Sequence, residues 1–79
     1  MACYFYHLHN DMDVPDEEGV ECASLDEAKT RAAEEALILL AEVLKEEGRI
    51  SLRHRIDIED EHGTVLATVS FQDVVNVEA

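Results

Sequence analysis

Cysteine, glycine, proline and basic residues are all scarce in this 79-residue chain, and each shortage narrows what the protein can be. Cys3 and Cys22 are the only cysteines, too few for a disulfide framework, so we expect reduced thiols and a cytoplasmic location. No apolar run approaches the roughly 20 residues that a membrane span needs. The N-terminus lacks the basic region and cleavage site of a signal peptide, and no glycine-rich phosphate loop is present.

Lysine and arginine total 6 residues against 19 aspartates and glutamates, which gives a formal net charge of −13. Because this charge repels phosphate and anionic lipid, we expect neither a nucleic acid nor a membrane as partner. Two interpretations stay open, ordinary solvated charge or an acidic surface made for a basic protein. The acidic residues crowd two connections, one with Asp11, Asp13, Asp16, Glu17, Glu18 and Glu21, the other with Asp57, Glu59, Asp60 and Glu61. Four of the six basic residues also fall together, namely Lys45, Arg49, Arg53 and Arg55.

Hydrophobic residues make up 47% of the chain, and their spacing predicts a globular single domain over residues 1–79. Period-two alternation and β-branched or aromatic content predict the strands. The predicted elements are strands over residues 2–9, 20–22, 53–59 and 64–71, a polar loop over 10–18 and a helix over 24–48. Residues 73–79 fit either a turn or an extended tail.

The predicted helix has clear signals at both ends. Ser24 is a favoured N-cap, and Glu27 is expected to bond back to the Ser24 amide. Gly48 supplies the left-handed residue that ends many helices. A wide apolar stripe, rich in alanine and then in leucine, is expected to pack on the sheet, and Ile38 falls outside it. An exposed isoleucine on so small a domain leaves a homodimer open.

The last two strands are expected to form a hairpin across residues 60–63. An even-length connection places Ile56 and Ile58 opposite odd-numbered residues of the partner strand, so the two apolar faces coincide. The predicted core contains the helix stripe with Tyr4, Tyr6, Leu8, Ile56, Ile58, Val65, Ala67 and Val69. Arg55, Asp57 and Glu59 are expected to point outward.

His7 and His9 share one face of the first strand. With Cys22 as a third ligand from a neighbouring strand, they give a zinc hypothesis, because zinc takes nitrogen and sulfur donors at about 2.0–2.3 Å. The alternative is the polar outer face of a strand, and on balance we predict no metal and no cofactor.

A catalytic site is not expected. A reactive thiol needs electropositive surroundings, which this acidic chain does not provide. The many carboxylates lie on faces and loops that we predict to be exposed, and a domain with one helix rarely encloses a pocket. We therefore predict that the protein is not an enzyme.

Short motifs follow one another along nearly the whole chain: Tyr4-Phe5-Tyr6-His7-Leu8, Asp16-Glu17-Glu18-Gly19-Val20-Glu21, Leu25-Asp26-Glu27-Ala28, Ile56-Asp57-Ile58-Glu59-Asp60 and Gly63-Thr64-Val65-Leu66, with Phe71 and Asp73 near the end. In this order and spacing they resemble a family of short bacterial domains of unknown function. The resemblance implies a stand-alone cytosolic bacterial protein. It transfers no active-site residue, because the family carries no assigned activity.

The stretch from Pro15-Asp16 through Gly19, followed by Ser24-Leu25-Asp26-Glu27-Ala28 and a helix rich in alanine and leucine, is similar to HicB-type antitoxins. It covers less than half of the chain. The chain departs from that pattern because it has no DNA-binding tail and two predicted strands follow the helix. The similarity implies a protein that neutralises a basic ribonuclease toxin.

The sequence thus predicts an α+β fold, a two-layer ββαββ arrangement with one long helix on a small antiparallel sheet. The predicted function is a small acidic non-enzymatic interaction module that binds a protein partner. The negative charge of the chain favours a basic partner. An antitoxin and a small metal-binding protein are the alternatives. The predicted interaction surface is formed by Asp16, Glu17, Glu18 and Ile38.

Overall fold

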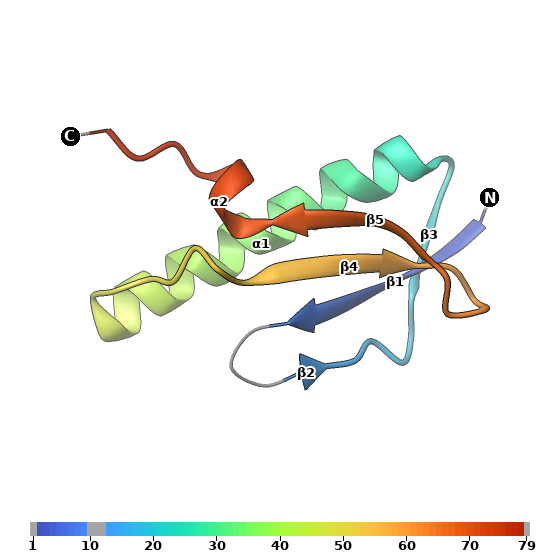
Figure 1. Ribbon diagram of the computed structural model, residues 1–79, viewed down its shortest axis with the longest axis horizontal. Coiled ribbons are helices and arrows are strands. Elements are labelled where there is room, and N and C mark those ends of the chain that lie inside the picture. Colours follow the sequence, from blue (N-terminus) through green and yellow to red (C-terminus); the bar gives the residue numbers. More distant parts are fainter. Residues whose placement is uncertain (1, 10–12, 79) are drawn as a thin grey trace.

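A computed structural model of the chain describes residues 2–9 and 13–78 and has one long helix packed on an antiparallel sheet (Figure 1). The strands are β1 (Ala2–His9), β2 (Asp13–Val14), β3 (Val20–Cys22), β4 (Arg55–Glu59) and β5 (Val65–Ser70). The helices are α1 (Leu25–Glu47) and α2 (Phe71–Val74). The predicted α+β class is confirmed. Asp11, part of the first acidic group, lies outside the described residues.

The sheet is built around β1, with the strand order β2-β1-β4-β5. β4 pairs along one side of β1, whereas β3 and β2 follow one another along the opposite side. All pairings are antiparallel, as short connections favour. The predicted strands over 2–9 and 20–22 are confirmed. The two-residue β2 lies within the segment that was predicted to be a polar loop. It was not predicted because so short a strand has no periodic pattern.

Both ends of α1 are capped. The Ser24 hydroxyl oxygen accepts a hydrogen bond of 3.2 Å from the Glu27 amide, as expected. The Glu27 carboxylate accepts from the Ala23 amide at 3.2 Å and not from the predicted Ser24 amide, so the capping box closes one residue earlier. At the other end Gly48 has φ of 70° and its amide donates to the Leu44 carbonyl at 2.8 Å.

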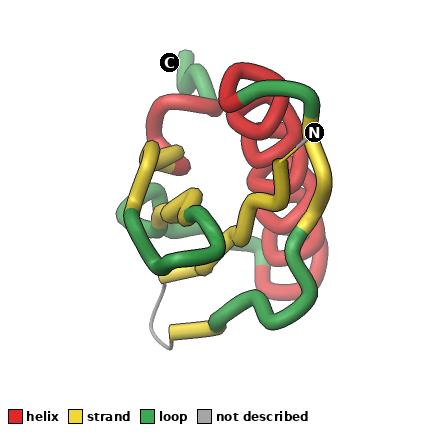
Figure 2. The backbone as a smooth tube through the Cα atoms, turned by 90° about the vertical axis from the view of Figure 1, so that its right-hand side faces the viewer, coloured by secondary structure: helices red, strands yellow, loops and turns green. Residues whose placement is uncertain are grey.

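One face of the sheet packs against α1, which lies to one side of the strands (Figure 2). The buried apolar side chains are Ala28, Ala32, Ala36 and Leu40 of the helix with Tyr4, Cys22, Ile56, Ile58 and Phe71. Tyr6, Leu8, Ala67 and Val69 are partly buried against them. The small alanines let the helix approach the sheet closely, since the Tyr6 hydroxyl donates to the Ala28 carbonyl at 2.8 Å. Burial, followed by the nearby Cys22, raises the pKa of Tyr6 to about 12.

The β4–β5 hairpin has the predicted register from Arg55 to Ile58, the part of β4 that is farther from the turn. Ile56 pairs with Val69 and Ile58 with Ala67, which keeps the apolar faces together. Beyond Ile58 the register shifts, so that Glu59 pairs with Val65 and Leu66 has no partner. The prediction that Val65 joins the core is therefore wrong, and this side chain is 51% exposed. A single extra residue moves every side chain beyond it to the other face of the sheet.

The chain leaves the sheet earlier than predicted. β5 ends at Ser70, and Phe71 begins α2 instead of completing a strand. The Phe71 amide donates to the His54 carbonyl at 3.0 Å, and its ring meets the His54 ring edge to face with centroids 5.7 Å apart. Phe71 is buried, so the turn into α2 closes one end of the core. Residues 75–78 follow without regular structure.

Among the described residues, neither α1 nor α2 combines the length and the apolar character needed to cross a membrane.

Candidate functional site

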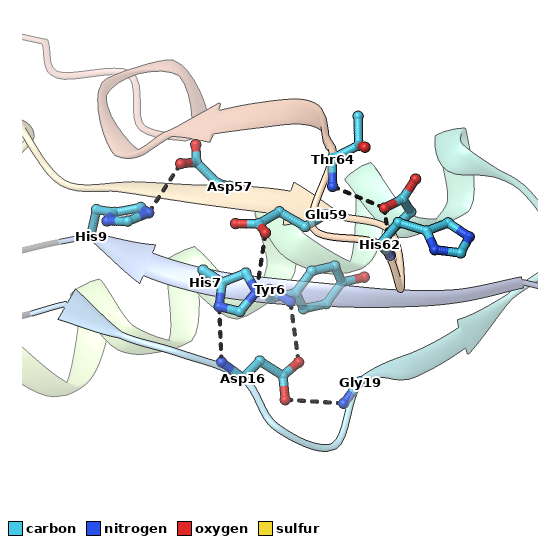
Figure 3. Close-up of polar contacts among 10 residues, drawn as sticks. Tyr6, His7, His9, Asp16, Gly19, Asp57, Glu59, His62 and Thr64 are labelled. Carbon is cyan, nitrogen blue, oxygen red and sulfur yellow. Dashed lines mark hydrogen bonds and ion pairs between the residues drawn. The ribbon is translucent and has the colours of Figure 1, made fainter.

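The sheet face turned away from α1, called the open face below, carries a row of histidines and carboxylates. Side chains alternate along a strand, so the odd-numbered residues of β1 and β4 share this face. His7 lies directly opposite Asp57 in the β1–β4 register. Figure 3 shows the His9 ring facing Asp57, and His7 lying between Glu59 and Asp16.

His9 is held between two carboxylates. Its Nε2 atom lies 3.0 Å from Oδ2 of Asp57, and its Nδ1 atom lies 2.8 Å from Oδ1 of Asp13. Asp57 belongs to β4 and Asp13 to β2, so one imidazole at the end of β1 connects the strands on both sides. Both distances are within hydrogen-bond range.

Asp57 is the one charged residue that the described part of the chain buries, with an exposed fraction of 8%. Its Oδ1 accepts a 2.9 Å hydrogen bond from the Thr68 hydroxyl and lies 3.4 Å from Nε of Arg55. A buried carboxylate needs such partners, because an unpaired one is costly in a low dielectric. Asp57 points away from α1, as predicted, but its neighbours on three strands cover it from water.

His7 has a different arrangement. Its Nδ1 atom accepts a hydrogen bond of 3.1 Å from the Asp16 amide, which leaves the proton of a neutral ring on Nε2. Nε2 is 3.6 Å from Oε1 of Glu59, a longer contact than those of His9. His7 thus makes one hydrogen bond, accepted from the Asp16 amide, and one longer contact with Glu59.

The loop between β2 and β3 is organised by the Asp16 carboxylate. Its Oδ2 accepts from the Tyr6 amide at 3.1 Å, and its Oδ1 accepts from the amides of Glu18 at 3.0 Å and Gly19 at 3.1 Å. Burial raises the pKa of Asp16, but the three amide bonds together outweigh it and hold the pKa below 3.8. Asp16 thus stays ionised and fixes the loop.

Gly19 completes this loop where β1 passes close by. Its φ is +75°, and a Cβ atom placed there would be 2.7 Å from Sγ of Cys3 and 2.9 Å from the Phe5 ring. Only glycine fits this close approach without a shift of its neighbours. The loop is therefore tied to β1 both by hydrogen bonds and by contact.

The β4–β5 turn is organised in the same way by Asp60. One carboxylate oxygen accepts from the amides of His62 at 2.8 Å and Thr64 at 2.9 Å. These bonds, with that of Thr64 the strongest, lower the pKa of Asp60 below 3.8. The fully exposed turn is thereby given one shape.

β3, which follows the loop, and the β4–β5 turn both lie near the start of β1, on opposite sides of that strand (Figure 1). We call this region the acidic end and define it as Glu17, Glu18, Glu21, Asp60 and Glu61. An open hollow of about 460 Å³ lies there, lined by Glu21, Asp60 and Glu61 with Ala2, Cys3, Tyr4, His62 and Leu66. Within the described residues, no lysine or arginine forms an ion pair with a carboxylate of the acidic end.

The opposite end, where α1 finishes and β4 begins, carries Lys45, Arg49, Arg53 and Arg55, and we call it the basic end. A hollow of about 400 Å³ lies beside the connection from α1 to β4, and Arg49, Arg53 and His54 are among its walls. Nη2 of Arg49 is 3.9 Å from the Glu47 carboxylate, and Arg55 contacts Asp57. Charges at this end are therefore partly balanced.

The chemistry that the open face can perform follows from these contacts. Three of the four ring nitrogens of His7 and His9 lie within hydrogen-bond distance of a partner, and the fourth, Nε2 of His7, lies 3.6 Å from Glu59. Cys3 and Cys22 are both free thiols. The prediction that the protein is not an enzyme stays a prediction.

The residues of the zinc hypothesis fall on two faces. His7 and His9 share the open face, whereas Cys22 is fully buried on the side of α1, in the cluster that contains Tyr4 and Ile58. The sheet thus separates the thiol from the imidazoles. Within residues 2–9 and 13–78, no group of three or more histidine, cysteine or acidic side chains is arranged to hold a metal ion.

The predicted interaction residues are also divided. Glu17 and Glu18 are exposed at the acidic end. The Asp16 carboxylate, in contrast, already accepts hydrogen bonds from backbone amides of the loop and of β1. Ile38 is 53% exposed on α1, in the other layer of the molecule. The acidic crowding in the sequence signalled Glu21, Asp60 and Glu61, but only the fold brings them together around one hollow.

A chain with a four-residue α2, a capped 23-residue α1 and an antiparallel sheet defines a small α+β domain. A family model described as a domain of unknown function, DUF6894, matches residues 3–72, which is 70 of the 79 residues. The chain belongs to this family, which confirms the resemblance to a family of short domains of unknown function. No curated protein and no solved structure matches the chain.

Proposed function

We propose that the protein is a small acidic interaction module that binds a basic partner protein through its acidic end. The observation that carries this proposal is the set of carboxylates without an arginine or lysine counter-ion on two loops of fixed shape. The carboxylates of Asp16 and Asp60 each accept hydrogen bonds from backbone amides, so the backbone that carries the neighbouring glutamates is held in place. A preorganised surface loses less entropy when a partner binds.

The charge makes a basic partner the one that this surface fits. Unpaired carboxylates gathered at one end steer a positively charged protein toward it and raise the rate of association. Each exposed ion pair contributes little by itself, so affinity would come from several contacts and would fall with added salt. The hollow beside Glu21 and Glu61 gives one basic side chain of the partner a place to enter.

The test is affinity capture from a native lysate at low salt, followed by binding measurements on the captured protein. The triple variant Glu17→Gln/Glu18→Gln/Glu61→Gln removes three charges of the acidic end and leaves the loop-forming aspartates in place. We expect its affinity for the captured protein to fall about tenfold, because each rim charge contributes roughly 0.5 kcal/mol.

The matched control is Glu34→Gln/Glu42→Gln/Glu46→Gln, which removes three exposed charges from α1. It changes the net charge equally but spares the acidic end, so its affinity should stay near that of the wild type. An equal loss in both variants would show a response to net charge alone and would contradict a localised surface.

The narrower predictions belong to the same proposal. If the captured protein is a basic ribonuclease that this chain inhibits, the result supports the antitoxin role. If it is another basic protein, the result supports an interaction module without antitoxin activity. A cytoplasmic location is part of the proposal and is supported by the two free thiols. A homodimer would be seen as a doubled mass in light scattering.

A further inference from the structure

The contacts of His9 pose a problem of charge. Both ring nitrogens lie at hydrogen-bond distance from carboxylate oxygens, at 2.8 Å and 3.0 Å. A neutral imidazole has one N–H group and one lone pair, so it can donate to only one of the two. The imidazolium donates from both nitrogens. The observed arrangement is therefore satisfied only by the protonated ring.

The groups around the ring come from every strand beside it. Asp13 contacts it from β2 and Asp57 from β4, and Arg55 of β4 and Thr68 of β5 hold the far side of Asp57. On its own strand, His7 lies two residues away, accepts a hydrogen bond from the Asp16 amide and lies 3.6 Å from Glu59. Two carboxylates, those of Asp13 and Asp57, contact His9. One guanidinium, that of Arg55, lies nearby and contacts Asp57.

The two carboxylates would respond differently to loss of the proton. The Asp57 side chain is 11% exposed, so it keeps the one remaining N–H donor, because an unpaired buried carboxylate is costly. The Asp13 side chain is 78% exposed and can turn to water instead. In the described residues, His9 is the ion-pair partner of Asp13. Deprotonation therefore releases Asp13 first.

Asp13 is half of β2. This strand meets β1 through two pairs of residues, Leu8↔Val14 and His9↔Asp13, and the loop that Asp16 organises follows directly. A two-residue strand has little backbone pairing of its own. The side-chain contact from His9 to Asp13 thus adds to the short backbone pairing between β2 and β1.

We propose that protonated His9 is a pH-dependent latch that holds β2 against β1. Histidine changes its charge between about pH 5 and pH 8. Since only the charged ring bonds both carboxylates, the latch is closed at the lower pH and opens as the pH rises.

The test is NMR on the isolated protein at about pH 5 and about pH 8. The readout is the nuclear Overhauser contact between the backbone protons of Leu8 and Val14, which reports β2 pairing directly. We expect the wild-type contact to be strong at the lower pH and largely lost at the higher one. In His9→Gln, whose side chain does not titrate, the contact should be the same at both values.

The control is His7→Gln, which removes the neighbouring ring but leaves the latch, so the pH response should persist. Asp13→Ala is a second variant that removes the response from the β2 side, should His9→Gln fold poorly. A wild-type contact that stays constant with pH, or a response that survives in both His9→Gln and Asp13→Ala, would overturn the latch. Loss of the response in His7→Gln would overturn it too, by assigning the titration to His7.

This experiment contains no partner protein, so its result is independent of the proposed function. A pH-responsive β2 with unchanged binding in the acidic-end variant would leave the latch standing and end the interaction proposal. A constant β2 with weakened binding in that variant would do the reverse.

Discussion

The acidic end and the basic end differ in how their charges are held. At the acidic end, two aspartates bond backbone amides and the glutamates between and beside them have no cationic partner in the described chain. At the basic end, Arg49 lies near Glu47, Arg55 contacts Asp57, and Lys45 sits in the last turn of α1, where the helix dipole favours a cation. The charges of the basic end are partly balanced by ion pairs, whereas the carboxylates of the acidic end have no lysine or arginine partner in the described residues.

The difference in charge pairing between the two ends favours a recognition role for the unpaired carboxylates over a role in solubility alone. A solubilising charge needs no fixed position, whereas the loop of the acidic end is anchored by three amide bonds and a close glycine contact. Fixed position combined with unpaired charge is what a recognition surface requires.

The largest expected effect is on the free energy of unfolding when a glycine at each end is replaced by alanine. Gly19 and Gly48 both have positive φ, but an added Cβ meets Cys3 and Phe5 at Gly19 and nothing within 4 Å at Gly48. Gly19→Ala should lower the free energy of unfolding by about 3 kcal/mol, from strain plus overpacking. Gly48→Ala should cost about 1 kcal/mol, from strain alone. Urea unfolding measures both, and equal losses would contradict the tight packing of the acidic loop.

The next largest effect concerns the anchors of the two connections. Asp16→Ala removes the acceptor of three amides and should lower the free energy of unfolding by about 2 kcal/mol, since bonds to a charged group are stronger than neutral ones. Ser51→Ala, at the basic end, removes one long bond of 3.4 Å to the Arg53 amide and should cost less than about 0.5 kcal/mol. A change in Tm that is as large for Ser51→Ala would show that both connections are equally fixed.

A smaller effect should appear as the pH falls. The pKa of Asp16 is lower in the folded state than its ordinary 3.8, so the ionised form favours folding. The stabilisation is complete above the unfolded-state value and is lost as the pH falls through the lowered pKa. The difference in free energy of unfolding between the wild type and Asp16→Asn should therefore be constant near neutral pH and shrink in acid. A difference that grows as the pH falls would contradict the assigned bonds.

The sequence predicted the elements that have strong periodic or capping signals. The long helix and the inner pairing of Ile56 and Ile58 were predicted, because amphipathic spacing and loop parity determine them. The bulge at Leu66 and the two-residue β2 depend on tertiary pairing and leave no such pattern. Each of them changes where side chains of the open face or its edge lie.

The candidate site was predictable in composition but not in its bonds. Alternation placed His7 and His9 on one face, yet strand order decides that Asp57 and Asp13 flank His9 on opposite sides. Asp57 was expected to face water, and three neighbouring side chains cover it. Local sequence gives the face of a strand, whereas burial on that face depends on residues distant along the chain.

The most direct test of the central claim is the dissociation constant of the captured partner over a salt series from about 50 mM to about 500 mM. The wild-type protein should lose affinity steeply. The Glu17→Gln/Glu18→Gln/Glu61→Gln variant should begin weaker, fall less, and meet the wild type at high salt. Parallel losses with an unchanged gap between the two proteins would contradict binding through the unpaired charges of the acidic end.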